Sequence, residues 1–443
     1  MAKAYKNLSK NELKIELNKL EKELKKYESL NLNISMARGK PCQEQLDLSM
    51  GMMDVLSSHN DLTCEDGFDC RNYGVLFGIT ECRRLLGEII EVPSDNIIIF
   101  GNSSLNVMFD CISRSMTHGV MGSTPWCKLD KVKWLCPVPG YDRHFAITEY
   151  FGIEMINIPM HSDGPDMDMV EKLVSSDPSI KGIWCVPKYS NPDGTTYSEE
   201  VVKRFAHLKP AAKDFRIYWD NAYSVHHLYE DKQDFLLEIL DECKKAGNPD
   251  LVYKFTSTSK ISFPGSGIAA IATSVNNMQD IKKQFSIQTI GHDKVNQLRH
   301  VRFFKNLDGI KKQMQKHAEI LRPKFELVES IFEEELGGLD IATWTKPHGG
   351  YFISFTSMNG CASTIIDKCK KVGLELTSAG CSFPYHHDPN DNNIRIAPSF
   401  PSLNELELAA KLFTLVVKIE SINKGALNFR GVEVVENDKN HGV

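Results

Sequence analysis

The sequence lacks the features of a membrane, secreted or disulfide-rich protein. No apolar run among its 443 residues approaches the length that spans a bilayer, and the charged N-terminus lacks the apolar core of a signal peptide. The twelve cysteines are scattered without a CxxC pair, which disfavours a disulfide framework and makes the cytoplasm the expected compartment. No His, Cys, Asp or Glu spacing is typical of a metal site, so we expect no metal.

The sequence also lacks an excess of basic charge and internal repeats. Its net charge of −6 provides no global positive field, so we expect no nucleic-acid partner, and the missing apolar span argues against a membrane partner. What is present suits a globular protein, because 42% of the residues are hydrophobic and can form a sizeable core. The length is enough for one large α/β domain and a smaller domain.

Residues 56–305 alternate short apolar runs with helical stretches, the pattern of a mainly parallel sheet covered by helices. We predict an α/β large domain here with a seven-stranded sheet. The strand candidates are residues 97–100, 133–136, 154–158, 182–186, 216–219, 251–255 and 268–272. Ligands of open α/β sheets bind at the carboxyl ends of strands. Gly101, Asp220 and Lys260 each stand just past such an end, so we expect them to share one site.

The two ends of the chain are predicted to pack together. Residues 1–55 comprise a helix over 9–28 and a loop, and Ser9 with Glu12 forms a capping-box pattern at the helix start. The helix has too few heptads for a free coiled coil, so we expect it to dock on the protein body or on a partner subunit. Residues 306–443 carry a long helical stretch and then strand, helix and strand, which predicts a smaller α+β domain.

Four polar residues at the ends of predicted strands or in turns occur in a distinctive order along the chain. Asn191 opens the turn Asn-Pro-Asp-Gly, Asp220 ends a strand, Tyr223 follows three residues later, and Lys260 closes the stretch Ser-Thr-Ser-Lys. Taken singly, each has an ordinary explanation: a turn, a helix cap or a solvated lysine. Their order and their strand-end positions together favour a shared chemical role.

This pattern resembles the fold-type I aminotransferases, the aspartate aminotransferase superfamily, which use pyridoxal 5'-phosphate (PLP). The resemblance implies that Lys260 is the Schiff-base lysine and that Asp220 keeps the cofactor's ring nitrogen protonated. It implies that Tyr223 and Asn191 donate hydrogen bonds to the phenolate oxygen. PLP needs an amine for its aldehyde, a carboxylate for its nitrogen and donors for its oxygen, so the chemistry fits these residue types.

The resemblance also implies where the rest of the cofactor binds. Its phosphate would lie on the segment Gly101-Asn102-Ser103-Ser104, which follows a strand and opens a helix, because a helix N-terminus attracts anions. Ser257 and Ser259 would add hydroxyl groups, and Tyr141 would stack on the pyridine ring, with core packing as its alternative. Tyr73 resembles the tyrosine that reaches the phosphate of the neighbouring subunit, which predicts a homodimer with active sites at the subunit interface.

Substrate contacts follow from the same resemblance. Arg395 corresponds to the arginine that binds the α-carboxylate, for which a planar guanidinium is well suited, and Gly39 to a backbone position that closes over it. Asn191 also belongs to the expected substrate site. A dicarboxylic substrate needs a second cation, for which Arg143 and Lys40 are candidates, with ordinary surface charge an equal alternative for each. His144 is expected to cap or pack rather than to catalyse.

One departure from the family pattern concerns the phosphate. Residues 261–268, just past Lys260, contain no basic residue, whereas well-known relatives carry a phosphate-binding arginine there. The motifs look closest to a divergent bacterial branch that includes MocR-like regulators and free-standing aspartate aminotransferases. Only about 35 residues precede the loop at Gly39, too few for a DNA-binding module and linker, so the enzyme reading is favoured.

The expected function is a PLP-dependent aminotransferase, a probable aspartate transaminase. It would transfer an amino group by a ping-pong reaction from aspartate or glutamate to 2-oxoglutarate or oxaloacetate, so its partners are amino acids and 2-oxo acids. The alternatives are a PLP-dependent transaminase of other specificity, such as alanine or aromatic amino acids, a PLP lyase, or a non-catalytic PLP-binding regulator.

Overall fold

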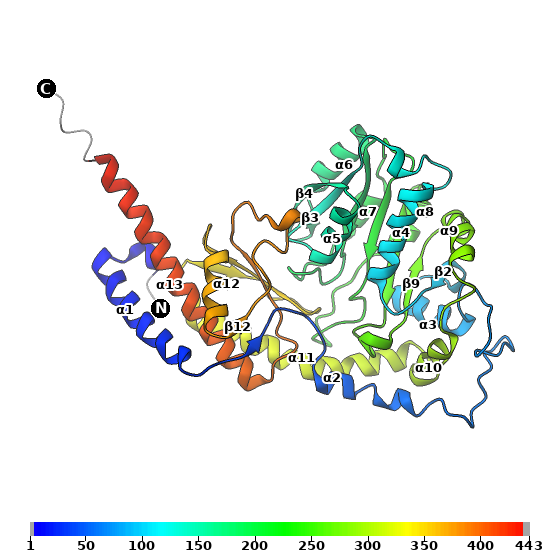
Figure 1. The fold of residues 1–443 in the computed structure, drawn as a ribbon, viewed down its shortest axis with the longest axis horizontal. Coiled ribbons are helices and arrows are strands. Elements are labelled where there is room, and N and C mark those ends of the chain that lie inside the picture. The colour runs from blue at the N-terminus through cyan, green and yellow to red at the C-terminus, as the bar shows by residue number, and fades with distance from the viewer. Residues whose placement is uncertain (1–3, 437–443) are drawn as a thin grey trace. The chain divides into compact units, whose positions relative to one another are not determined.

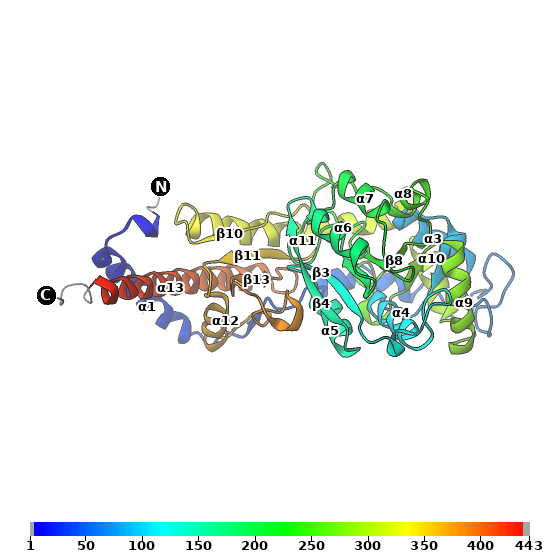
Figure 2. The same ribbon diagram turned by 90° about the horizontal axis from the view of Figure 1, so that it is seen from above.

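The computed structural model describes residues 4–436, with side chains described as far as residue 425. The chain divides into two compact units. Unit 1 contains residues 1–40, 321–346 and 351–443, and unit 2 contains residues 41–320 and 347–350. Figures 1 and 2 show the ribbon from two directions. No helix within the described part of the chain is long and apolar enough to cross a membrane.

Unit 2 is built on an eight-stranded sheet with the order β2-β9-β8-β7-β6-β3-β4-β5. Neighbouring strands from β8 to β4 pair in parallel, whereas β9 and β5 pair in antiparallel fashion with their neighbours. The strands are β2 (Ile97–Ile99), β3 (Lys133–Val138), β4 (Glu154–His161), β5 (Gly164–Pro165), β6 (Ile180–Cys185), β7 (Arg216–Asp220), β8 (Val252–Ser257) and β9 (Ala269–Ala272). The predicted mainly parallel α/β fold is confirmed.

The eighth strand is the one addition to the seven predicted strands. β5 has only two residues and pairs with the end of β4, with Met160 opposite Pro165. A two-residue return strand has no apolar run of its own, so sequence periodicity could not indicate it.

Both faces of the sheet are covered, which explains why its strands are continuous apolar runs. Along β7, Tyr218 faces one core cluster, whereas Ile217 and Trp219 face the other. Helices α4, α5 and α9 contribute to the first cluster and α6, α7 and α8 to the second. The helices of unit 2 are α2 (Gln43–Asp47), α3 (Thr80–Ile90), α4 (Ser104–His118), α5 (Asp142–Tyr150), α6 (Met167–Ser176), α7 (Glu199–Ala206), α8 (Ile239–Lys245), α9 (Val275–Gln288) and α10 (Lys294–Phe304).

Unit 1 is an α+β unit around a three-stranded antiparallel sheet, β10-β11-β13. A separate parallel pair joins β1 to β12, so that Ile34 near the N-terminus pairs with Leu374. The elements are α1 (Lys10–Glu28), β1 (Ile34–Ser35), β10 (Ala342–Trp344), β11 (Ile353–Ser357), α12 (Ala362–Lys371), β12 (Leu374–Glu375), β13 (Asn393–Ile396) and α13 (Leu403–Glu436). Helix α11 (Leu307–Leu336) begins in unit 2 and ends in unit 1.

The N-terminal helix docks within unit 1. α1 packs along α13, with Leu13, Leu20 and Leu24 buried. Its start has the predicted capping box, because the Ser9 hydroxyl accepts from the Glu12 N–H and the Glu12 carboxylate accepts from the Ser9 N–H. The two ends of the chain therefore share one core.

Candidate active site

A cavity of about 340 Å³ opens at the carboxyl ends of the strands in unit 2. β6, β7 and β8 are parallel, so the loops that follow them meet at one edge of the sheet. The lining includes ten of the residues singled out above: Asn102, Ser103, Ser104, Tyr141, Asn191, Asp220, Tyr223, Ser257, Ser259 and Lys260. Residues that are up to 158 positions apart in the sequence, from Asn102 to Lys260, thus surround one space.

Asp220 is the last residue of β7, and its carboxylate is buried with only one oxygen engaged. Oδ2 lies 2.9 Å from Nε2 of His144, while the buried Oδ1 has no hydrogen-bond partner in the described part of the chain. A buried carboxylate oxygen without a partner is costly unless a ligand satisfies it. No helix starts at Asp220, since the next one is α8, so the helix-cap alternative does not apply.

His144 was expected to cap or pack, and it does pack, with its ring stacked 4.4 Å from that of Trp184. It also holds Asp220 in place through the hydrogen bond to Oδ2. Its ring is 1% exposed, so water does not compete for this bond. His144 is therefore a positioning residue that the sequence could not indicate, because its partner lies 76 residues away.

Lys260 and two tyrosines line the same cavity. The Lys260 Nζ lies 5.0 Å from the ring centroid of Tyr223, which is buried. Burial raises the pKa of Tyr141 to about 12, with the nearby Lys260 ammonium acting in the opposite direction. The Tyr141 hydroxyl therefore stays protonated at neutral pH and can donate a hydrogen bond.

The start of α4 forms one end of the cavity. Ser103 is its N-cap and makes no side-chain cap bond, so the first N–H groups of this 15-residue helix are available to an anion. Ser259 Oγ donates to the Asn102 carbonyl oxygen at 3.1 Å and accepts from Ser257 Oγ at 3.1 Å. These bonds bring the loop after β8 that carries Lys260, the lysine loop, beside α4. Gly101 is not among the lining residues; its carbonyl oxygen accepts from the Ala269 N–H at 2.7 Å.

Arg299 of α10 is a basic residue that the sequence did not single out. It lies beside the loop after Lys260, where its Nη2 donates to Ser266 Oγ at 2.6 Å. Pro264 in that loop lines the cavity, and its carbonyl oxygen accepts from Asn102 Nδ2 at 3.4 Å. The buried Nε of Arg299 has no hydrogen-bond partner among residues that the structure describes.

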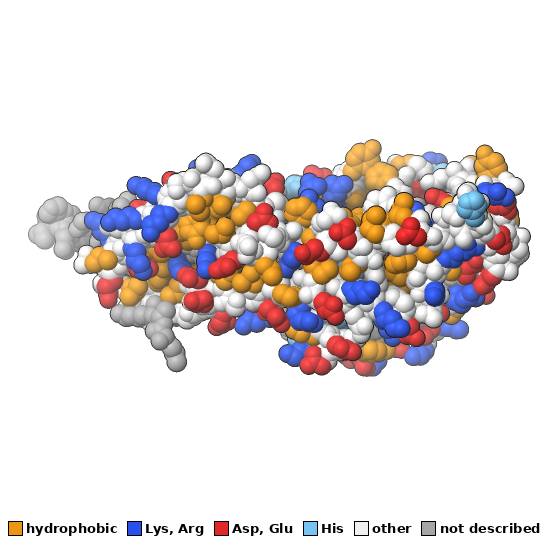
Figure 3. All heavy atoms as spheres, turned by 90° about the horizontal axis from the view of Figure 1, so that it is seen from below, with side chains coloured by type: hydrophobic (Ala, Val, Ile, Leu, Met, Phe, Trp, Pro, Cys, Tyr) orange, Lys and Arg blue, Asp and Glu red, His pale blue; other side chains and the backbone are white. Residues whose placement is uncertain are grey.

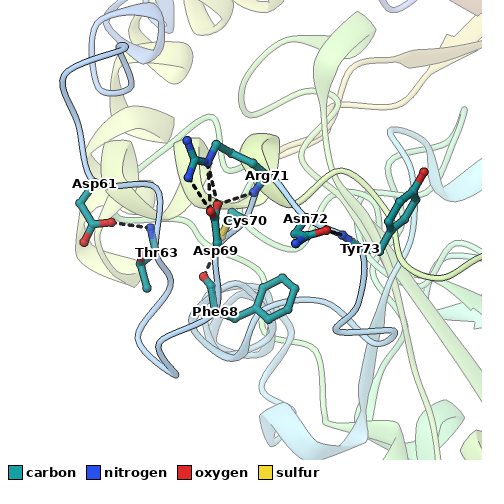
Figure 4. Close-up of polar contacts among 8 residues, drawn as sticks. All are labelled: Asp61, Thr63, Phe68, Asp69, Cys70, Arg71, Asn72 and Tyr73. Atoms are coloured by element: carbon teal, nitrogen blue, oxygen red, sulfur yellow. Dashed lines mark hydrogen bonds and ion pairs between the residues drawn. The ribbon is translucent and has the colours of Figure 1, made fainter.

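Tyr73 lies elsewhere in unit 2, on a loop that Figure 4 shows in close-up. The loop is held by local bonds: Asp69 binds Arg71 through two oxygens, and Asn72 Oδ1 accepts from the Tyr73 N–H at 2.9 Å. The Tyr73 side chain points away from these contacts and is 79% exposed. It does not line the cavity of its own chain.

Arg395 and Gly39 belong to unit 1. Arg395 lies on β13 and is buried; its guanidinium carbon is 5.0 Å from the centroid of the Phe352 ring, and its Nη2 is 3.5 Å from Thr377 Oγ1. Gly39 contacts the same ring so closely that a Cβ there would come within 2.5 Å of it. A side chain at position 39 would force the Phe352 ring to shift, so Gly39 and Arg395 both pack against the same ring.

Lys40 and Arg143, the two candidates for binding the side-chain carboxylate of a substrate, both lie on the surface. Lys40 is exposed, with its Nζ 3.7 Å from the centroid of the Phe400 ring in unit 1. Arg143 is exposed in the first turn of α5 and does not line the cavity. Neither observation identifies a carboxylate site.

Comparison with known proteins identifies the family. The family model for aspartate amino-transferase matches residues 8–428. The chain belongs to this family. It is 45% identical over 391 residues to an aspartate aminotransferase of Corynebacterium glutamicum, covering 88% of this chain and 90% of that protein. It is also 45% identical over 405 residues to a putative aminotransferase of Mycolicibacterium smegmatis, covering 91% and 94%.

A solved structure agrees with the sequence comparison. An aspartate transaminase from Corynebacterium glutamicum superposes with a TM-score of 0.93 at 42% identity, covering 96% of this chain and all of that one. The chain is therefore an aminotransferase, and its family implies amino acids and 2-oxo acids as substrates. The predicted position of the chain within the family, close to the MocR-like branch, is not confirmed and stays a prediction.

Proposed function

We propose that this aminotransferase holds PLP in the unit 2 cavity and acts on aspartate or glutamate with 2-oxoglutarate or oxaloacetate. The observation that carries the cofactor assignment is the buried, unpartnered Oδ1 of Asp220 in a cavity that Lys260 also lines. A protonated pyridine nitrogen is the donor this oxygen lacks. The N-terminus of α4 and the hydroxyls of Ser257 and Ser259 suit the phosphate.

Each residue has a distinct task in the proposed reaction. When bound, the cofactor supplies an electron-accepting ring linked to the substrate Cα. The Lys260 amine moves the proton at that Cα, Asp220 keeps a proton on the ring nitrogen, and His144 fixes the Asp220 carboxylate. Tyr223 and Asn191 would donate hydrogen bonds to the phenolate oxygen, and Tyr141 would stack on the ring.

The substrate's α-carboxylate is assigned to Arg395. A guanidinium with a planar fork binds a carboxylate through two parallel hydrogen bonds, and a buried one gains more from this pair than an exposed one. Arg143 or Lys40 would read the side-chain carboxylate. The aspartate specificity is supported by the sequence match and the solved structure from Corynebacterium glutamicum, whose names both specify aspartate.

We also propose that the protein is a homodimer and is located in the cytoplasm. The exposure of Tyr73 away from its own cavity supports a homodimer in which this side chain reaches the partner's phosphate site. All twelve cysteines are free, which supports a reducing compartment, the cytoplasm.

Two measurements test the cofactor site. Borohydride reduction of the purified holoenzyme followed by peptide mapping should place the pyridoxyl label on Lys260, and Lys260→Ala should lose the visible absorbance of the bound cofactor. The control variant is Lys282→Ala, which should keep the absorbance because Lys282 is exposed and does not line the cavity. Lys254 is unsuitable as a control because it is buried and paired with Glu238. A label on any other lysine would refute the assignment.

A substrate panel tests the two carboxylate assignments. Arg395→Ala should weaken every amino donor alike, by about 2–5 kcal/mol in transition-state binding. Arg143→Ala or Lys40→Ala should penalise aspartate and glutamate and leave residual alanine activity nearly intact, because alanine lacks the second carboxylate. If both variants keep the full preference for dicarboxylates, the side-chain site lies elsewhere.

A further inference from the structure

A second cavity, of about 310 Å³, lies in unit 2 and is lined in part by the same two loops as the first. In the loop after β7, Asp220 and Tyr223 line the cofactor cavity, whereas Asn221 and Ser224 line the second one. The loop after β6 is shared in the same way. Asn191 faces the first cavity and Lys188 the second.

This sharing gives the second cavity a route to the chemistry. A molecule bound there would contact the two loops that position Asp220, Tyr223 and Asn191. If that molecule prefers one arrangement of these loops, its binding must change the affinity for cofactor or substrate. Binding of cofactor or substrate must then change the affinity for that molecule by the same factor.

Two polar groups of the second cavity, the buried Asn221 and the half-buried Lys188, have unused hydrogen-bonding capacity. Asn221 is 5% exposed, and its Oδ1 has no hydrogen-bond partner within residues 4–425. The Lys188 Nζ donates to the Ser224 carbonyl oxygen at 3.1 Å, yet burial lowers the pKa of Lys188 to about 8 in spite of the nearby Asp234 and Glu91. The Lys188 ammonium, with one of its three N–H groups bound to Ser224, can donate further hydrogen bonds, and the Asn221 amide oxygen can accept one.

The remaining charges on the cavity wall are of both signs. Lys254 and Glu238 form a buried pair at 2.7 Å, so they compensate each other. Burial lowers the pKa of His227 to about 4, so this residue is neutral at physiological pH. The basic residues Lys188 and Lys311 and the acidic residues Asp234, Glu88 and Glu91 also line this cavity, so groups of both signs surround it.

We propose that this cavity binds a free α-amino acid as an effector, at a site separate from the substrate site. The ligand's carboxylate binds Lys188 and Lys311, and its ammonium group donates to Asn221 Oδ1 and Asp234. Neither a simple anion nor a simple amine satisfies both sets of groups, because the walls contain unmet acceptors and unmet donors together. This inference goes beyond the proposed function and does not depend on which amino acid is transaminated.

The test uses glycine as the probe, with acetate and methylamine as its two halves. The holoenzyme is reduced with borohydride, so that the cofactor is fixed to Lys260 and no amino-group transfer occurs. Arg395→Ala is introduced as well, to remove the α-carboxylate site. Calorimetry should then detect glycine binding, with acetate and methylamine each binding at least tenfold more weakly.

Variants on the cavity wall decide whether the second cavity is the site. Lys311→Met should weaken glycine binding tenfold or more, whereas Lys312→Met, the next and equally exposed residue of α11, should leave it unchanged. Lys188→Met should have at least the effect of Lys311→Met. Equal binding in Lys311→Met and Lys312→Met, or no detectable glycine binding, would overturn the proposal.

Coupling to the cofactor has its own readout. The fluorescence of the reduced pyridoxyl group should change with the same dependence on glycine concentration as the heat signal, and Lys311→Met should shift both together. Binding without a fluorescence change would overturn the effector role. If borohydride leaves no label on the protein at all, the proposed cofactor site has failed, and the unreduced protein still tests glycine binding.

Discussion

At the scale of single residues, the site depends on a short chain of contacts that ends at Asp220. Trp184 stacks on His144, and His144 binds Asp220 Oδ2, which leaves Oδ1 available for the proposed cofactor. Each member fixes the orientation of the next one. The charge at Asp220 and the orientation of its carboxylate are therefore separate contributions that separate variants can measure.

Asp220→Asn removes the charge while keeping the shape. We expect this variant to fold and to bind PLP but to lose kcat by about 10²–10³-fold, because the lost charge stabilises the transition state rather than the bound substrate. Steady-state kinetics with a fixed amino donor measure the change. Near-normal kcat would mean that Asp220 has only a structural role.

His144→Phe keeps the stacking on Trp184 and removes the hydrogen bond. We expect a smaller loss of activity, about 10–100-fold, together with a shift in the pH dependence of the cofactor's absorbance. His161→Phe is the surface control, since His161 is largely exposed. An unchanged pH dependence would show that His144 acts through packing alone.

At the scale of elements, the lysine loop is supported from behind by two helices. His300 of α10 accepts from Ser262 Oγ at Nε2 (2.8 Å), and its Nδ1 donates to the Asn296 carbonyl oxygen at 2.9 Å. His317 of α11 donates from Nε2 to the Ile261 carbonyl oxygen at 3.2 Å. Its Nδ1 accepts from Gln45 Nε2 at 3.0 Å. Both rings are thus used as donor and acceptor, which only the neutral form can do.

Acid should therefore loosen the lysine loop. Burial lowers the pKa of His300 and of His317 from 6.5 to about 4, so the unfolded chain binds more protons than the folded one between these values. Stability is then fully present above pH 6.5 and falls as the pH drops towards 4, by up to about 3 kcal/mol for each group. Urea unfolding at several pH values measures this. His300→Asn should flatten the slope, whereas the exposed control His207→Asn should not.

Arg299 is our candidate for the positive charge that the lysine loop lacks. Arg299 binds Ser266 beside the α4 N-terminus, where the phosphate is proposed to bind. We therefore expect Arg299→Gln to weaken PLP binding by roughly tenfold, because a positive charge near the phosphate is lost. Equilibrium dialysis of the apoprotein with PLP measures the affinity directly. Arg302→Gln, three residues further along α10, is the matched control, and an equal loss in both variants would remove this role.

The elements also explain what the sequence could and could not predict. The seven main strands and the residues at their ends were predictable, since a doubly covered sheet needs continuous apolar runs and its loops meet at one edge. β5, β1 and β12 were not, because two-residue strands have no periodicity. The bond of His144 to Asp220 and the roles of Arg299 and His317 were missed for another reason: their partners are tens of residues away, so nothing local in the sequence indicates them.

At the scale of the whole molecule, the surface carries charges of both signs. On the face shown in Figure 3, Lys and Arg side chains are interspersed with Asp and Glu, and apolar side chains form small groups between them. No single-sign field dominates that face, in agreement with the net charge of −6. The proposed association with a second copy should therefore depend on local contacts, for which the exposed Tyr73 is our candidate.

Mixing two inactive or weakened variants tests whether Tyr73 serves the partner's site. Lys260→Ala lacks the proposed Schiff-base lysine, and Tyr73→Phe lacks the phenolic hydroxyl that would reach a phosphate group. If the hydroxyl acts across the dimer, each mixed dimer has one intact site, made of the Lys260 of one chain and the Tyr73 of the other. Co-refolding the two variants should then restore activity at low PLP concentrations. If Tyr73 acts within its own chain, the chain that keeps Lys260 still lacks the hydroxyl. Mixing then restores nothing, because every site carries one of the two defects.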